Sequence, residues 1–166
     1  MAVATTDLSE KEIWSWLEDV PDPEIPVVSV VELGIVRDVS LDDDAVVVTV
    51  TPTYSGCPAT AVIAIDIEQA LRSRGVKDVR INTQLSPAWT TDWITQAARE
   101  KLSAYGIAPP VKDAICVGVL KGNAVIKCPR CKSSNTECIS QFGSTPCKAH
   151  YRCKDCLEPF DYFKSF

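Results

Sequence analysis

CPRCKSSNTECISQFGSTPCKAHYRCKDC, residues 128–156, begins and ends with a Cys-x-x-Cys pair. Two residues between two cysteines allow one tight turn to present both sulfurs to the same ion, and two such turns complete a tetrahedral site. The pairs are separated by 21 residues, slightly more than is usual for this pattern. We therefore predict a structural zinc site, with a mononuclear iron or a cluster as the alternative. Its four ligands would be Cys128, Cys131, Cys153 and Cys156.

The residues between the two pairs predict a β-hairpin. Residues 136–142 and 146–152 have the composition of two strands joined by a short turn, which together with the metal would make a zinc ribbon. A turn at residues 142–143 would place Cys138 opposite Cys147. The two thiols could then pair, bind a ligand or simply pack.

The composition is that of an ordinary globular protein. The 166 residues are 46% hydrophobic and 23% charged, with a formal net charge of -5, which excludes a disordered chain. No apolar run reaches the roughly 18 residues of a membrane span. The first twelve residues do not resemble a secretory signal, so we expect a cytoplasmic location. In a reducing compartment the cysteines are expected to be thiols or metal ligands rather than disulfides.

Charge divides the chain into two parts. Residues 1–110 contain 17 acidic and 8 basic residues, whereas residues 111–166 contain 5 acidic and 9 basic residues. The double proline Pro109-Pro110 lies at this change and is typical of a linker. We predict two domains, residues 1–108 and residues 109–166. The second is near or below the size at which a metal, disulfides or a partner is usually needed, and Cys116 is expected to be a core thiol within it.

Hydrophobic periodicity in the first domain predicts the element order αββαβα. Ser9 and Glu12 form a capping-box pattern that should start the first helix, and Thr91 should cap the last one. The fold class is therefore α+β, a small mixed α/β domain followed by a zinc-ribbon β-hairpin module. The expected helices cover residues 9–19, 58–75 and 91–105, and the expected strands cover residues 35–41, 45–51 and 79–85.

Cys57 lies between a strand and the start of a helix. Backbone N–H groups and the positive end of the helix stabilise an anion there, which favours a reactive thiolate. The alternative is a small buried thiol with no chemistry. Asp22 and Glu24 could likewise be nothing more than a solvated turn. Trp89 could belong to a partner surface, although packing in the core is the more frequent use of a tryptophan.

Four sequence blocks follow one another in the first domain: DPEIP at 22–26, ELGIV at 32–36, TPTYSGCP at 51–58 and SPAWT at 86–90. In this order they resemble the small iron–sulfur assembly domain of SufT-type proteins. The resemblance implies that Cys57 is the functional residue and that the domain delivers or inserts iron–sulfur clusters. It makes Asp22, Glu24 and Thr53 further candidates for handling a transient cluster.

Three segments stand out in the C-terminal region: CPRC at 128–131, ISQFGSTPCKAHYRC at 139–153 and CLEPFDYFK at 156–164. They resemble the C-terminal region of the PaaD family, whose members are accessory proteins of aerobic phenylacetate catabolism. This resemblance implies a non-catalytic role beside the multicomponent phenylacetyl-CoA epoxidase. The expected partners are the epoxidase components, above all the iron–sulfur reductase, with a homodimer also possible and no membrane partner. The family pattern expects a cysteine where this chain has Ser165.

A nucleic-acid-binding zinc ribbon is the rival interpretation. It would use the basic residues around the two cysteine pairs, but these can equally form a solvated face or a dock for an acidic protein, and the acidic first domain would oppose a phosphate backbone. A catalytic di-iron protein is excluded because paired Glu-x-x-His motifs are absent and the chain has one histidine, His150. The basic residues concerned are Arg130, Lys132, Lys148, Arg152 and Lys154.

The aromatic residues near the C-terminus have two possible uses. As exposed side chains, Phe160, Tyr162, Phe163 and Phe166 would be anchors for a partner. The alternative is that they close the small core of the ribbon. The docking hypothesis assigns residues 157–166 to binding the reductase or the whole epoxidase complex.

Overall fold

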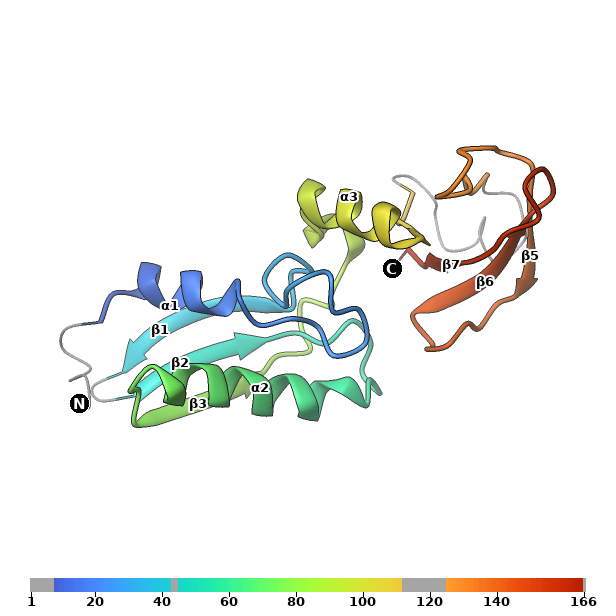
Figure 1. Cartoon of the computed structure of the whole chain (residues 1–166). Coiled ribbons are helices and arrows are strands. Elements are labelled where there is room, and N and C mark those ends of the chain that lie inside the picture. The colour runs from blue at the N-terminus through green and yellow to red at the C-terminus, as the bar shows by residue number, and fades with distance from the viewer. Residues whose placement is uncertain (1–7, 43–44, 112–124, 166) are drawn as a thin grey trace. The chain divides into compact units, whose positions relative to one another are not determined.

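The computed structural model describes residues 8–42, 45–111 and 125–165 and groups the chain into two compact units, residues 1–89 and 90–166. Each unit has its own sheet, as Figure 1 shows. The first sheet is mixed and has helices packed on it, and the second belongs to the zinc-ribbon region, so the predicted fold class is confirmed. Within the described residues no helix is long and apolar enough to cross a membrane.

The first unit is a three-stranded sheet of order β1-β2-β3 with two helices. β1 pairs with β2 in antiparallel fashion, whereas β2 and β3 run parallel, so α2 serves as the crossover between them. Helix α1 contacts both α2 and β1, and α2 contacts β3. The elements are α1 (Glu10–Leu17), β1 (Val36–Asp42), β2 (Ala45–Val50), α2 (Ala59–Ser73) and β3 (Asp78–Thr83).

Local sequence signals fix the ends of these helices. Ser9 and Glu12 form the predicted capping box: the Ser9 hydroxyl accepts from the Glu12 N–H at 3.3 Å, and the Glu12 carboxylate accepts from the Ser9 N–H at 3.0 Å. Helix α2 follows Pro58, which occupies the cap position and provides no side-chain hydrogen bond. Gly75 follows the end of α2 with a φ of 96°, a conformation that glycine adopts without strain.

Trp89 belongs to the core of the first unit. It is 4% exposed, and its indole N–H donates to the backbone oxygen of Leu33 at 3.0 Å. Core packing, rather than a partner surface, is therefore its role. This hydrogen bond also connects two of the four sequence blocks that define the assembly domain. Other fully buried side chains of this core are Ile13, Leu17, Val48, Ile67 and Leu71.

The second unit begins with a 3-10 turn and ends in a four-stranded sheet of order β4-β7-β6-β5. Its last helix starts at Gln96, later than predicted, because Thr95 is the residue whose hydroxyl accepts from the N–H of Ala98. Gly106 ends this helix with a φ of 96°. The elements are the 3-10 turn Thr91–Trp93, α3 (Gln96–Tyr105), β4 (Ile107–Ala108), β5 (Thr136–Ser140), β6 (Lys148–Cys153) and β7 (Pro159–Phe163).

The predicted domain boundary at residues 108/109 differs from the division at 89/90. Strand β4 pairs in parallel with β7, so residues 107–108 are part of the ribbon sheet rather than the end of the first domain. The buried guanidinium of Arg99 donates to the backbone oxygens of Thr91 and Pro110, both at 2.6 Å. These contacts bind α3 and the double proline into the second unit.

The ribbon hairpin has a different register from the predicted one. Cys138 pairs with Tyr151 rather than lying opposite Cys147, because β5 ends at Ser140 and β6 begins only at Lys148, so the connection is longer than the predicted turn at residues 142–143. Cys147 is buried, with its sulfur 3.0 Å from the Thr145 hydroxyl. Cys116 lies outside the described residues.

The C-terminal aromatic residues form the ribbon core. Phe160, Tyr162 and Phe163 are all buried, so the expectation of exposed anchors is wrong for these three and the core alternative is right. Tyr162 packs edge-on against Tyr151 at 5.7 Å between ring centroids. Desolvation, followed by the neighbouring Cys138 thiol, raises the pKa of Tyr151 to about 12. Phe166 lies outside the described residues.

Arg99 provides a test of the second unit. Replacing it with Met should lower the free energy of unfolding of this unit by about 2 to 3 kcal/mol, because two buried carbonyl oxygens lose a charged donor. Thermal unfolding of the zinc-loaded protein measures the change. Lys101→Ala, an exposed change on the same helix, is the control. Equal melting of the Arg99→Met variant and the wild type would contradict the anchoring role.

Candidate functional site

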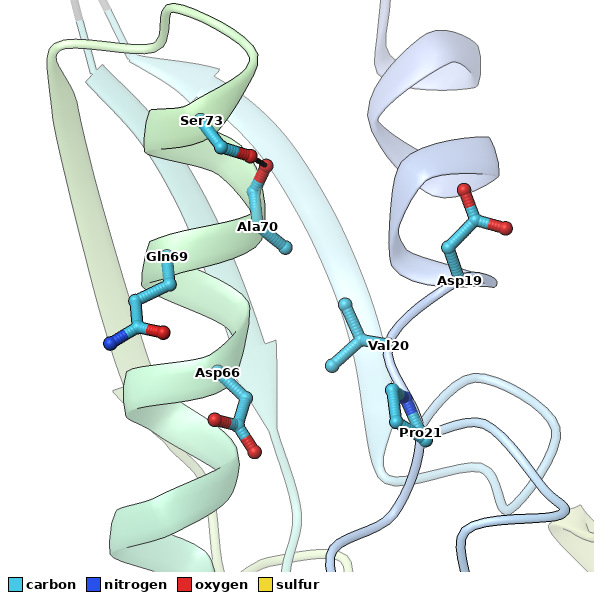
Figure 2. Close-up of a pocket in the computed structure, with 7 residues that line it drawn as sticks. All are labelled: Asp19, Val20, Pro21, Asp66, Gln69, Ala70 and Ser73. Atoms are coloured by element: carbon cyan, nitrogen blue, oxygen red, sulfur yellow. Dashed lines mark hydrogen bonds between the residues drawn. The ribbon is translucent and has the colours of Figure 1, made fainter.

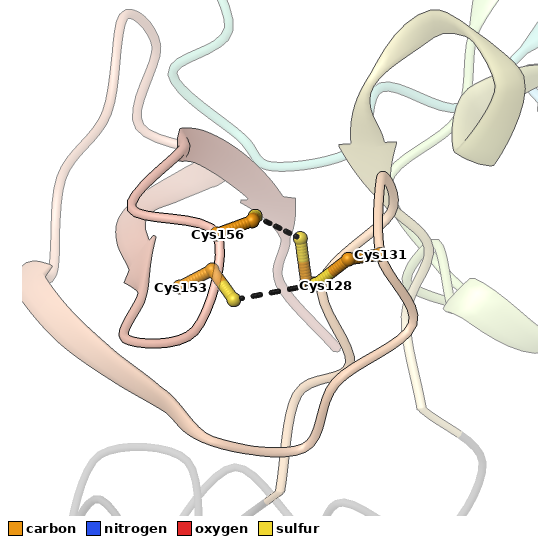
Figure 3. A group of neighbouring side chains, drawn as sticks. All are labelled: Cys128, Cys131, Cys153 and Cys156. Atoms are coloured by element: carbon orange, nitrogen blue, oxygen red, sulfur yellow. Dashed lines mark hydrogen bonds between the residues drawn. The ribbon is translucent and has the colours of Figure 1, made fainter.

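Four cysteine sulfurs converge at one end of the second unit. The ligand atoms of Cys128, Cys131, Cys153 and Cys156 all lie within 4.8 Å of one another. Figure 3 shows the four side chains gathered between the two turns. Two contacts cross between the pairs, with 3.8 Å from Cys128 to Cys156 and 3.5 Å from Cys131 to Cys153. Among the described His, Cys, Asp and Glu side chains, these four cysteines form the group that lies close enough together to hold a metal ion.

The sulfur spacing fits a tetrahedral zinc site. Zinc–sulfur bonds of about 2.3 Å place the sulfurs of a regular tetrahedron about 3.8 Å apart. Cys128 and Cys153 are fully buried in the ribbon core, whereas Cys131 and Cys156 are exposed. The structure therefore brings together all four predicted ligands in a donor set that fits structural zinc.

The surroundings of these thiols change their pKa values in opposite directions. The N–H of Cys156, then that of Asp155, donates to Cys153 and lowers the pKa of its thiol to about 7. At Cys131 the Ser133 N–H acts to lower the pKa, but desolvation and the neighbouring thiols outweigh it and raise the pKa to about 12. Four thiols this close cannot all ionise unless a cation compensates their charge, as a divalent metal does.

Sequence reasoning missed a polar group beside the metal ligands. The Asp155 carboxylate accepts from Ser133 and Asn135, which lie close to the other cysteine pair, and both hydrogen bonds lower its pKa. The available signal in the sequence was that Ser133, Asn135 and Asp155 are polar and lie next to the cysteine pairs. The sequence does not show that they form hydrogen bonds with one another, because that depends on how the fold brings the two pairs together.

The basic residues of the ribbon are engaged within the protein. Three of them form ion pairs with Glu137 or Glu158, and Lys148 lies 3.8 Å from Asp161. Lys132 donates to the Ser103 hydroxyl and to the Pro129 carbonyl. Paired cations offer less to a phosphate backbone than free ones, which weighs against the nucleic-acid interpretation. The three cations paired with glutamates are Arg130, Arg152 and Lys154.

Cys57 lies in the first unit, in the loop between β2 and α2. The loop begins at Thr51, whose N–H donates to the Ile35 oxygen at 2.8 Å. It ends in a tight turn in which the Cys57 N–H donates to the Tyr54 oxygen at 3.1 Å, and the Cys57 oxygen accepts from Thr60 in α2. The thiol is half-buried, between the exposed Gly56 and Pro58. Its predicted position at a helix start is confirmed, and its reactivity stays a prediction.

Asp22 has a structural task in the proline-rich loop. It is 6% exposed, and one carboxylate oxygen accepts from the N–H groups of Glu24 and Ile25 at 2.9 and 2.8 Å. Glu24 and Thr53 are half-buried. In the part of the chain that the structure describes, Asp22, Glu24 and Cys57 do not form a metal-binding cluster. Their role in handling a cluster stays a hypothesis.

Thr51 was not singled out by sequence reasoning, although it lies in the same block as Cys57. It is 2% exposed, and its hydroxyl is the buried side-chain oxygen without a hydrogen-bond partner among the described residues. An unsatisfied buried hydroxyl costs about 1 to 3 kcal/mol. The loop that carries Cys57 thus starts at an energetically unfavourable group, a feature that often marks functional sites.

An open pocket of about 460 Å³ lies between the end of α1 and helix α2. Figure 2 shows the residues that line it. None of the predicted site residues lines it. One of its two carboxylates, Asp19, is paired with Arg74 at 2.9 Å. The pocket is therefore separate from the Cys57 loop and from the four-cysteine site. The lining residues are Asp19, Val20, Pro21, Asp66, Gln69, Ala70 and Ser73.

Comparison with known protein families assigns one domain to each region. Residues 113–164 match the family described as PaaD zinc beta ribbon domain, and residues 10–83 match the family described as iron-sulfur cluster assembly protein. A protein of Escherichia coli strain K12, provisionally named as a subunit of 1,2-phenylacetyl-CoA epoxidase, is 51% identical over 92% of this chain and 91% of its own length. The chain belongs to the PaaD family.

The assembly domain of this PaaD-family chain has relatives of its own. The Fe-S protein maturation auxiliary factor YitW of Bacillus subtilis is 36% identical over 54% of this chain and 89% of its own length. A crystal structure of a DUF59 domain of unknown function from Bacillus anthracis covers 56% of this chain and 90% of its own, with 32% identity and a TM-score of 0.52. The first unit therefore has the fold of this assembly-domain family.

The zinc ligands are tested by Cys153→Ser. The variant should lose zinc and unfold the ribbon, because metal binding contributes about 10 to 16 kcal/mol to the folding of small zinc domains. Residues 10–83 should stay folded, since their core is independent. Zinc analysis and limited proteolysis measure both effects, and Cys138→Ser, a strand cysteine outside the cluster, is the control. A Cys153→Ser protein that keeps its zinc and its protease resistance would show that the ligand assignment is wrong.

Proposed function

We propose that this chain is a non-catalytic accessory protein that assists iron–sulfur cluster assembly for a phenylacetyl-CoA epoxidase system. The observation that carries the proposal is the presence of both family domains in a chain that is 51% identical to a protein named as an epoxidase subunit. The relatives of the first domain are named Fe-S protein maturation auxiliary factors. A single chain would thus combine cluster handling with recognition of an epoxidase component.

Cys57 is the proposed cluster-handling thiol. It is the only cysteine in residues 1–115, whereas an iron–sulfur cluster usually needs four protein ligands. Cys57 alone cannot hold a cluster permanently, so the remaining ligands would come from a donor, a client or a second copy of the chain. A half-buried thiol at the start of a helix suits transient contact of this kind. Asp22, Glu24 and Thr53 are proposed to assist it.

The ribbon is the proposed docking module, with zinc in a structural role. Its aromatic tail is buried, so Leu157 takes the place of those aromatic residues as the candidate anchor. Leu157 is 70% exposed and has a φ of 64°, an unfavourable conformation for a residue with a branched side chain. A strained and exposed leucine directly after a metal ligand is a reasonable contact for a partner. The iron–sulfur reductase component is the proposed client.

Cys57→Ala tests the cluster-handling role. The variant should keep its zinc and its thermal stability, because a loop thiol contributes little packing, but it should no longer support epoxidase activity in cells that depend on this protein. Cys138→Ser, which removes an exposed thiol from the ribbon, is the matched control and should retain full support. Full activity with Cys57→Ala would remove Cys57 from the proposal.

Leu157→Gly tests the docking role. Glycine relieves the left-handed backbone strain, so the ribbon should be at least as stable as in the wild type. Binding to the purified reductase should nevertheless weaken about tenfold or more, as is typical for the loss of an anchor. Ile139→Ser, another exposed aliphatic side chain of the ribbon, should bind normally. Unchanged affinity of Leu157→Gly in a titration would move the docking surface elsewhere.

A further inference from the structure

The metal site joins two turns that are distant in the sequence. Cys128 and Cys131 belong to the first turn, and Cys153 and Cys156 belong to the second, 21 residues further on. Because each turn supplies two of the four sulfurs and sulfur contacts of 3.5 and 3.8 Å cross from one turn to the other, the tetrahedron forms only when the turns are held at the right separation. The fold must therefore contain groups that connect the turns independently of the sulfurs.

Asp155 makes such a connection. It lies between Cys153 and Cys156 in the second turn, and each of its carboxylate oxygens accepts one hydrogen bond from the segment that follows the first turn. One oxygen accepts from the Ser133 hydroxyl, and the other accepts from the side-chain amide of Asn135 at 2.7 Å. A carboxylate with two different donors is fixed in position and in orientation.

The two donors are themselves held by the backbone. The backbone oxygen of Ser133 accepts from the N–H of Cys128 at 2.9 Å, and the backbone oxygen of Asn135 accepts from the N–H of Lys154 at 2.8 Å. The Ser133 hydroxyl also accepts from the N–H of Asn135 at 3.0 Å. Residues 133–135 therefore contact the first turn on one side and the second turn on the other.

We infer that Asp155, through Ser133 and Asn135, is a positioning residue that holds the two cysteine turns in register for the metal. These contacts fix the separation of the turns before the sulfurs close around an ion, and they resist its loss afterwards. Outer groups of this kind typically change metal affinity about 10- to 100-fold. The inference does not depend on the role of Cys57 or on the client.

The sharpest test is a reciprocal exchange. Asp155→Asn leaves one acceptor for two donors, and Asn135→Asp places two carboxylates opposite each other, so each variant should release zinc about tenfold faster than the wild type. The double variant again places an amide opposite a carboxylate, with the same net charge as the wild type, and it should recover slow release. Release from the zinc-loaded full chain to a chromogenic chelator measures all four proteins.

Glu158→Gln is the matched control. It removes one negative charge close to the same turn and leaves Ser133 and Asn135 unchanged. The ion pair with Arg130 that it breaks also joins the two turns, but the pair is exposed, and exposed ion pairs contribute little to stability. Its zinc release should match that of the wild type. If it releases zinc as fast as Asp155→Asn, local charge rather than positioning controls the site, and the inference is overturned.

A second readout separates positioning from general destabilisation. In cobalt-substituted protein, the ligand-field bands report the tetrahedral geometry of the four sulfurs. Asp155→Asn should shift these bands, and the double exchange should restore them. Bands identical to the wild type in every variant, or a double variant that releases zinc as fast as the single ones, would contradict the inference. A single variant that fails to retain zinc at all is judged by the same exchange: recovery in the double variant supports the inference, and no recovery overturns it.

Discussion

The convergence of four cysteine sulfurs is the constraint on which the second unit depends. Among the residues that the structure describes, the hydrophobic cluster of the ribbon has eight members, and two of them, Cys128 and Cys153, are metal ligands. A core of this size is rarely sufficient to stabilise a small domain. The strands β5, β6 and β7 therefore depend on the metal site, which connects the turn before β5 to the turn between β6 and β7.

The first unit obeys a different constraint. Its sheet and two helices have an independent hydrophobic core that includes Trp89, so no metal is needed to hold it together. The Cys57 thiol in one of its loops is therefore not needed as a ligand for a structural metal. Five of the eight cysteines thus fall into two kinds by the metal chemistry that we assign to them: four that are used for structure in the ribbon, and Cys57, which we propose for the transient handling of clusters.

Much of this organisation could be predicted from sequence because the signals are local. The Ser9–Glu12 capping box, the valine-rich strands and the Cys-x-x-Cys spacings each depend on a few neighbouring residues, and the structure confirms them. The pairing of β4 with β7 depends on residues more than fifty positions apart, which no local pattern contains. For the same reason the double proline was interpreted as a linker. The hairpin register was less predictable, because the connection between its strands is longer than the sequence indicated: residues 141–147 join β5 to β6.

The aromatic tail was ambiguous because Phe160 and Tyr162 suit a core as well as an interface, and only burial decides between them. The contact of Asp155 with Ser133 and Asn135 joins two exposed turns, and a sequence gives no measure of their distance. Both features depend on which segments the fold brings together. Residue type alone does not determine them.

The central claim is that the two kinds of cysteine hold different metals. Its most direct test is the zinc, iron and acid-labile sulfide content of protein purified without oxygen and reconstituted with iron and sulfide. The account predicts about one zinc per chain in both the wild type and Cys57→Ala, with iron and sulfide bound by the wild type alone, where a second copy of the chain supplies further ligands. Iron and sulfide that remain in Cys57→Ala but disappear in Cys153→Ser would contradict it, because the ribbon would then be the cluster site.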